Sequence, residues 1–223
     1  MAVEALRNKT PRELRRAVNG FSLRYVEDWN AWLHARQNER PQLFGRILRK
    51  WQATRPVAMR RLKAEAQHRP PFLEDLLRSA AEPLRLLGRL TVVRIAHRTR
   101  EQDKALTKLW TNFSRLSTAD VPSCVGISKA VLLLTNGRIG PALDSRVRRA
   151  LGVRPPTTAR AWLTVLEDVA KDIAAFEASH GPLTNAVPAR FAHLAYGRLY
   201  DMALGPREPG RKDKPAARRR RGS

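Results

Sequence analysis

Apolar residues recur every three or four positions along most of this chain, which is the spacing that gives a helix one buried face. In the segment 22–40, for example, Leu23, Val26, Trp29 and Leu33 fall on one side. Because the tryptophans lie within such stripes, we expect core positions for them rather than base-stacking platforms. We therefore predict an all-α, multi-helix protein. Helical spacing or a helix-starting proline marks further segments, which are 41–55, 56–69, 70–90, 101–117, 157–179 and 188–204.

Proline, glycine and composition mark the boundaries of the expected elements. Pro83 predicts a break or a kink within 70–90, because proline has no N–H and clashes with the preceding turn. The segment 89–96 has the composition of a short strand, although no partner strand is evident. We expect residues 1–204 to form one helical domain. Residues 205–223 show no periodicity, and we expect them to form a disordered basic tail.

Composition narrows the class of protein. The apolar content of 43% is enough for a folded core. No run approaches the roughly 18 apolar residues of a membrane span, and the first residues lack the apolar segment of a secretory signal. The single cysteine, Cys124, excludes an internal disulfide, and the five histidines show no zinc-ligand spacing. We expect a cytoplasmic, nucleoid-associated protein that does not bind a membrane, and the oligomeric state stays open.

The net charge of +23, from 43 Lys and Arg against 20 Asp and Glu, predicts a polyanionic partner. Nucleic acid is the commonest such partner, and phosphate contacts drive its binding. The alternative is an arginine-rich, solvated surface that reflects GC-rich codons. The segment 36–69 holds ten basic and two acidic residues, so it is either a phosphate-facing strip or the solvated backs of two helices. The tail, with eight basic residues against two acidic ones, should adhere to phosphate backbones, including those of RNA.

Lys129 is the one charged residue in the apolar run 121–137. A lysine there is costly to bury unless it is paired, loses its proton or reaches the surface. A buried lysine with a lowered pKa becomes a nucleophile near neutral pH, whereas arginine does not deprotonate. Because 34 of the 43 basic residues are arginine, the choice of lysine here is compatible with chemistry. The alternative is a lysine whose ammonium group reaches solvent at one end of its helix.

Asp144 precedes a short predicted helix, 145–151, which ends at a glycine. Aspartate is a favoured N-cap, so a purely structural role is a strong interpretation. The turn signal Asn136-Gly137 can also bring Asp144 back beside Lys129, where opposite charges would offset the cost of burial. Capping and chemistry are compatible, because a side chain at a helix start is held rigidly.

Several residues of the stretch 121–147 follow a known pattern. Val121-Pro122, Val125-Gly126 and Ala130 match the hairpin form Leu-Pro-Gly-hydrophobic-Gly-x-Lys-x-Ala. The run from Pro141 to Val147 matches the Pro-x-Asp-x-x-Val element that follows it, with one extra residue. Through these residues the chain resembles the helix-hairpin-helix DNA glycosylases, the superfamily of 8-oxoguanine glycosylase and endonuclease III, including an uncharacterised bacterial branch.

Besides the extra residue between Pro141 and Asp144, the sequence departs from that pattern in two places within the hairpin. Ser123-Cys124 stands where the hairpin has its first glycine, with one residue extra. Lys129 follows Gly126 by three residues, whereas the enzymes have the lysine two residues after the glycine. One residue on a helix corresponds to about 100° of rotation, which changes the direction of the amine.

The resemblance implies a helix-hairpin-helix glycosylase-like fold for residues 1–204 and a DNA glycosylase/AP lyase that excises a damaged base from duplex DNA. It assigns Lys129 as the nucleophile at the sugar C1′ and Asp144 as its electrostatic assistant. Neither a metal nor an organic cofactor is needed. Nucleic-acid contacts are expected from Gly126, Ser128, Arg138, Arg146, Arg148 and Arg149.

Two further functions remain open from the sequence. The first is a catalytically inactive helix-hairpin-helix protein that binds nucleic acid on the same scaffold. The second is an RNA-binding protein that uses only its basic body and tail. The sequence does not specify which lesion or base an enzyme of this kind would remove, nor the pathway.

Overall fold

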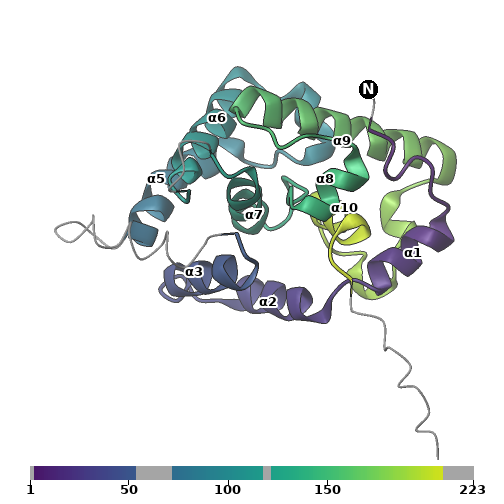
Figure 1. The fold of residues 1–223 in the computed structure, drawn as a ribbon, viewed down its shortest axis with the longest axis horizontal. Coiled ribbons are helices and arrows are strands. Elements are labelled where there is room, and N and C mark those ends of the chain that lie inside the picture. The colour runs from purple at the N-terminus through teal and green to yellow at the C-terminus, as the bar shows by residue number, and fades with distance from the viewer. Residues whose placement is uncertain (1–2, 54–71, 118–121, 208–223) are drawn as a thin grey trace, which may run out of the picture.

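A computed structural model of the chain describes residues 3–53, 72–117 and 122–207. Their regular secondary structure is helical, which confirms the all-α prediction (Figure 1). Within these ranges, Phe21 and Arg207 form an isolated antiparallel β-bridge. The helix expected at 56–69 lies outside the described residues.

Five α-helices of the described chain begin after a side chain that accepts a backbone N–H. Thr10 and Thr99 form capping boxes, and Ser123, Asp144 and Thr158 each cap the helix that follows. The elements are α1 (Pro11–Asn19), α2 (Leu23–His34), α3 (Arg40–Lys50), α5 (Phe72–Leu87), the 3-10 helix η1 (Val92–His97), α6 (Arg100–Ser114), α7 (Cys124–Leu134), α8 (Ser145–Leu151), α9 (Ala159–His180), the 3-10 helices η2 (Leu183–Ala186) and η3 (Ala189–Phe191), and α10 (Tyr196–Leu204).

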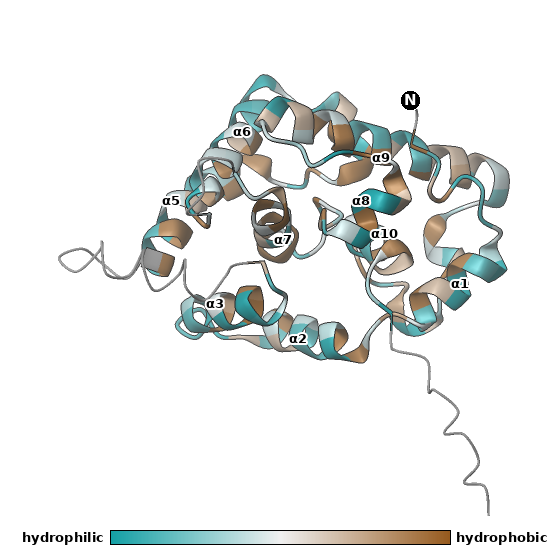
Figure 2. Cartoon of the chain, viewed as in Figure 1, coloured by the Kyte–Doolittle hydropathy of each residue, from teal (hydrophilic) through white to brown (hydrophobic). Residues whose placement is uncertain are grey.

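Helix α7 lies at the centre of the fold, with α2 and α3 on one side and α5, α6 and α9 on the other (Figure 1). Its residues are buried around nearly the whole circumference, and it is strongly hydrophobic (Figure 2). A helix that is apolar all round is stable only when other elements cover every side. The prediction of a buried helix after Pro122 is therefore confirmed.

The structure has neither the break expected at Pro83 nor the strand expected after it. Helix α5 runs on through Pro83 to Leu87 without a break, because it packs along α6, and this packing compensates for the lost hydrogen bond. The expected strand at 89–96 is wrong, since Val92–His97 forms the 3-10 helix η1. Without a partner strand, the Val92 N–H donates to the Arg138 carbonyl at 2.8 Å instead.

The core contains every tryptophan of the chain, as their positions in apolar stripes predicted. None exposes more than 5% of its surface, which leaves no indole free to stack on a nucleic-acid base. The tryptophans also meet one another and the phenylalanines, for example in the ring pairs Trp110–Trp162 and Trp32–Phe44.

The first residues assigned to the tail belong to the folded body. The Ser22 N–H donates to the Pro206 carbonyl at 3.0 Å, next to the bridge between Phe21 and Arg207. The described structure ends at Arg207, so the rest of the predicted tail, 208–223, lies outside it.

Candidate functional site

The first turn of α7 packs directly against the chain segment that follows α3. Ser123 caps α7 by accepting the Gly126 N–H at 3.3 Å. A Cβ atom placed on Gly126 would lie 2.9 Å from the Ala53 carbonyl oxygen, which is closer than real Cβ atoms approach. Glycine is therefore required here by the protein's own backbone. The Gly126 N–H, which the sequence assigned to a phosphate, is taken up by the Ser123 hydroxyl.

Ser128 joins α7 to the loop before α8. Its hydroxyl donates to the Cys124 carbonyl at 2.6 Å and accepts the Leu143 N–H at 2.7 Å. With 1% of its surface exposed, Ser128 does not lie on a nucleic-acid-facing surface. It fixes the distance between α7 and the segment that carries Asp144.

Lys129 is buried, with 5% of its surface exposed. Its Nζ donates a hydrogen bond of 2.5 Å to the carbonyl oxygen of Trp51, which lies at the C-terminal cap of α3. Carbonyls at a helix end lack intrahelical partners and carry the negative end of the helix dipole, so a cation is favoured there. The structure therefore contradicts the alternative in which the Lys129 ammonium group reaches bulk solvent.

Burial lowers the pKa of Lys129 from its ordinary value of 10.5, because the charged form loses its water. The carboxylates of Asp144 and Asp201 act in the opposite direction, and burial outweighs them. The site thus combines a desolvated amine with two nearby acidic side chains, and the amine loses its proton more readily than a lysine in water.

Asp144 is the N-cap of α8, as the sequence predicted. Its Oδ1 accepts the N–H groups of Arg146 and Val147, both at 2.9 Å. The cap uses one carboxylate oxygen only, so Oδ2 is not committed to the helix. The chain returns from α7 through Asn136 and Gly137, whose φ angles of 49° and 79° confirm the predicted turn.

Asp201 of α10 is a second buried carboxylate near Lys129, and the sequence analysis did not select it. Its Oδ1 accepts the Ala142 N–H at 3.1 Å, and its Oδ2 accepts from Nη1 of Arg198 at 2.7 Å. Burial raises the pKa of Asp201 to about 6, and the Arg198 charge acts against this rise. The sequence signal was a charged pair at i and i+3 inside the otherwise apolar segment 196–204.

Arg198 connects α10 to α2 through polar and aromatic contacts. It is 1% exposed, and its Nη2 donates to the Tyr25 carbonyl at 3.2 Å. Its guanidinium lies over the ring of Trp29 at 4.5 Å and that of Phe21 at 4.9 Å, in cation–π geometry. Arg198 therefore acts as a structural cation whose charge opposes the effect of burial on Asp201, next to the Lys129 site.

The four arginines assigned to strand gripping divide into two pairs. Arg138 and Arg148 are half-buried and bond to the protein itself: Arg138 to the carbonyls of Thr135 and Gly88, and Arg148 to that of Leu143. Their roles in the structure are to complete loop and helix ends. Arg146 and Arg149 are exposed at α8, so their charges are available to a ligand.

Comparison with known proteins adds no relative. No protein-family model matches the chain, and neither a curated protein nor a solved structure matches it. Within the described ranges, no group of His, Cys, Asp and Glu is arranged to hold a metal ion. Among the helices there, none is both long and apolar enough to cross a membrane.

Proposed function

We propose that this protein is a DNA-binding protein of the DNA glycosylase/AP lyase type, with Lys129 as the nucleophile. The observation that supports this function is the buried Lys129 amine, whose pKa is lowered by burial beside Asp144 and Asp201. A nucleophilic amine must be neutral when it attacks, and desolvation favours the neutral form. The net charge of +23 supplies the attraction for a polyanionic substrate.

The reaction follows from the chemistry of an amine and a nucleoside. The damaged nucleotide leaves the stack, because its C1′ is not accessible inside the duplex. The Lys129 nitrogen forms a bond to C1′ while the bond from C1′ to the base breaks, and the base leaves with that electron pair. Ring opening gives an iminium ion at C1′. Loss of a proton from C2′ then expels the 3′ phosphate and nicks the strand.

Asp144 would act on this reaction through its charge. The transition state carries positive charge on the sugar, and a carboxylate fixed nearby stabilises such charge without reorganisation. The Oδ1 of Asp144 is held by two backbone N–H groups of α8, and its Oδ2 is free of the cap. Asp144 is thus oriented by the helix that it caps.

Access to the amine requires a change at Trp51. In the folded chain the Lys129 amine bonds to the Trp51 carbonyl, and Gly126 on the same face of α7 contacts Ala53. Attack on a sugar therefore requires that Lys129 exchange the Trp51 carbonyl for the substrate. The hydrogen bond keeps the amine in one position until then.

The same contacts favour a second candidate, a DNA-binding scaffold without chemistry. Lys129 completes the end of α3, Ser128 joins α7 to Leu143, and Gly126 admits the Ala53 carbonyl. All three residues thus have structural uses that require no reaction. In this second function, Lys129 serves only to cap α3.

Borohydride trapping separates the two functions. Sodium borohydride reduces an enzyme–DNA imine to a stable covalent adduct, so we expect the unsubstituted protein to become joined to duplexes that carry an abasic site or 8-oxoguanine. Lys129→Ala and the length-matched Lys129→Met should lose the adduct and keep DNA binding, whereas Lys171→Ala, at an exposed lysine, should keep both. Asp144→Asn should bind normally and react more slowly.

Two other outcomes would each favour a different function. If the unsubstituted protein binds duplex DNA and gives no adduct on any lesion, the scaffold function replaces the enzyme. If it binds RNA and not duplex DNA in a salt titration, both DNA functions are wrong, and the RNA-binding alternative takes their place.

A further inference from the structure

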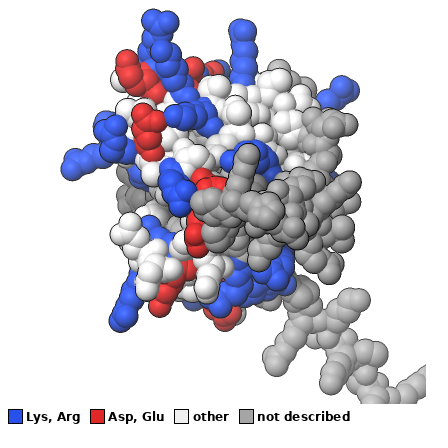
Figure 3. All heavy atoms as spheres, turned by 90° about the vertical axis from the view of Figure 1, so that its left-hand side faces the viewer, with Lys and Arg blue, Asp and Glu red and all other residues white. Residues whose placement is uncertain are grey.

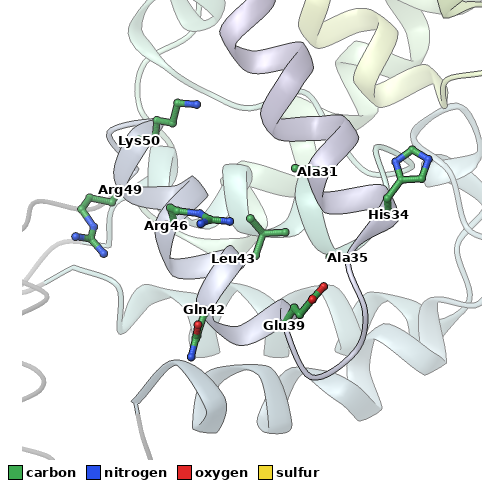
Figure 4. Close-up of a pocket in the computed structure, with 9 residues that line it drawn as sticks. All are labelled: Ala31, His34, Ala35, Glu39, Gln42, Leu43, Arg46, Arg49 and Lys50. Atoms are coloured by element: carbon green, nitrogen blue, oxygen red, sulfur yellow. The ribbon is translucent and has the colours of Figure 1, made fainter.

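A groove of about 810 Å³ lies between α2 and α3, at the surface of the molecule (Figure 4). Its walls include Leu43 and the short side chains of α2, and its edge on α3 carries Arg46, Arg49 and Lys50. Arg46 points from α3 across the groove, whereas Arg49 points outward at its edge (Figure 4). The residues assigned to nucleic-acid binding through the resemblance do not line this groove, whose α3 wall instead belongs to the segment 36–69 that the sequence marked as a possible phosphate-facing strip.

Arg46 and Arg49 carry charges that no acidic side chain of the described chain neutralises. Both are exposed, and neither takes part in an ion pair within the described ranges. They lie three residues apart on one helix, with Arg46 across the groove and Arg49 at its edge. Exposed guanidinium groups are suited to phosphate, which each can bind through two parallel N–H bonds.

Lys50, in contrast, is already paired. Its Nζ lies 2.5 Å from Oδ1 of Asp28, and the other oxygen of Asp28 accepts from the indole of Trp51 at 2.9 Å. The Lys50 charge is therefore largely cancelled, and its role is to anchor the end of α3. The positive charge of the groove rests on Arg46 and Arg49.

The groove has a basic end and an acidic end. Glu39 lies at the start of α3, where its carboxylate accepts the Arg36 N–H at 3.0 Å. Arg46 and Arg49 lie toward the other end of the helix, next to Trp51. A polyanion is therefore favoured at the end that adjoins Trp51, whose carbonyl receives the Lys129 amine.

We infer that Arg46 and Arg49 bind the phosphate backbone of DNA in the groove between α2 and α3. The inference rests on the DNA-binding part of the proposed function and adds a surface that the α7–α8 residues do not include. The face of the molecule seen in Figure 3 carries basic side chains from top to bottom, with acidic ones interspersed among them. An extended partner fits an open groove better than a small enclosed anion does.

The test is the salt dependence of duplex DNA binding. Each phosphate contact contributes about 0.9 to the slope of log K against log salt, so Arg46→Gln/Arg49→Gln should lower the slope by about 1.8. The matched control is Arg12→Gln/Arg16→Gln, which removes the same charge from exposed positions on α1. Because all four arginines are exposed, both variants should keep the circular dichroism spectrum and melting temperature of the unsubstituted protein.

Three outcomes would overturn the inference. Equal losses of slope in the two variants would mean that only the overall charge matters. An unchanged slope in Arg46→Gln/Arg49→Gln would mean that the groove holds no phosphate. A loss confined to RNA would make RNA the partner. Failure of borohydride trapping, with the slope difference still present, would remove the enzyme and leave the groove as a DNA-binding surface.

Discussion

The ammonium group of Lys129 donates to the carbonyl of Trp51, a residue 78 positions earlier in the chain, at 2.5 Å. This hydrogen bond joins the central helix α7 to the end of α3. It gives the most buried lysine of the described chain a hydrogen-bond partner inside the protein. Burial of the Lys129 amine has two consequences, a lowered pKa and restricted access, which can be measured separately.

The first prediction concerns the pH dependence of stability. The folded-state pKa of Lys129 is lowered from 10.5, so between the two pKa values the unfolded chain holds a proton that the folded chain lacks. The free energy of unfolding therefore rises with pH across that window, and Lys129 contributes least to stability below it. Lys129→Met should remove this rise and should be more stable by about 1 kcal/mol at neutral pH, because it buries no charge.

Urea unfolding at a series of pH values measures this effect. The difference between the unsubstituted protein and Lys129→Met should change with pH up to 10.5, whereas Lys171→Met, at an exposed position, should give a flat difference. A flat curve for Lys129→Met as well would show that burial does not perturb the amine.

The second prediction concerns the buried pair Arg198–Asp201. Asp201→Ala removes the whole carboxyl group and leaves the Arg198 charge buried without its acceptor, which should cost about 3 kcal/mol. The double variant Arg198→Met/Asp201→Ala should recover most of this loss, since no unpaired charge then remains. Chemical denaturation at neutral pH tests both variants, and a double variant that is no better than the single one would contradict the coupling.

Asp201 also has a pH signature of its own. Its folded-state pKa of about 6 lies above its ordinary value of 3.8, so between these values the folded chain holds a proton that the unfolded chain has lost. Its contribution to stability is therefore present below 3.8 and is lost as the pH rises through about 6. Asp201→Asn cannot take up this proton, so its free energy of unfolding should not show this fall as the pH rises. Unfolding of the variant and of the unsubstituted protein, compared over the acidic range, measures the difference.

The third prediction concerns Gly126. A methyl group there would lie 2.9 Å from the Ala53 carbonyl, so Gly126→Ala must displace the segment Trp51–Ala53 or strain α7. We expect a loss of about 1–3 kcal/mol, as for other overpacked sites. Because Trp51 accepts the Lys129 amine, the displacement should also make that amine react faster with an acylating reagent.

Mass spectrometry of the labelled peptides gives the rate at Lys129 relative to exposed lysines. Gly20→Ala, at a distant glycine with an ordinary φ of −87°, serves as the control and should leave Lys129 as slow as in the unsubstituted protein. An unchanged rate in Gly126→Ala would mean that the segment Trp51–Ala53 does not protect the amine.

Local patterns predicted most of the secondary structure. The Asp144 and Asn136-Gly137 signals act over a few residues, so they have the same effect in the folded chain as in the sequence. The segment 89–96 was predicted wrongly for the complementary reason, because a strand depends on a distant partner and the sequence does not show whether one exists.

The site was only partly predictable. Lys129 and Asp144 stood out because a charge in an apolar run and an aspartate before a helix are visible one residue at a time. Asp201 and the Trp51 carbonyl did not, since the first comes from a helix far along the chain and the second is a backbone atom without a residue signature.

By itself, the sequence determined that this chain is helical, that it buries its tryptophans, that one lysine lies in its most apolar run, and that it is strongly basic. Those properties depend on composition and on spacing within single helices. Only the tertiary structure decided which group meets the Lys129 amine and which arginines remain unpaired. Such pairings depend on how α3, α7 and α10 pack together, and packing joins residues that no local pattern relates.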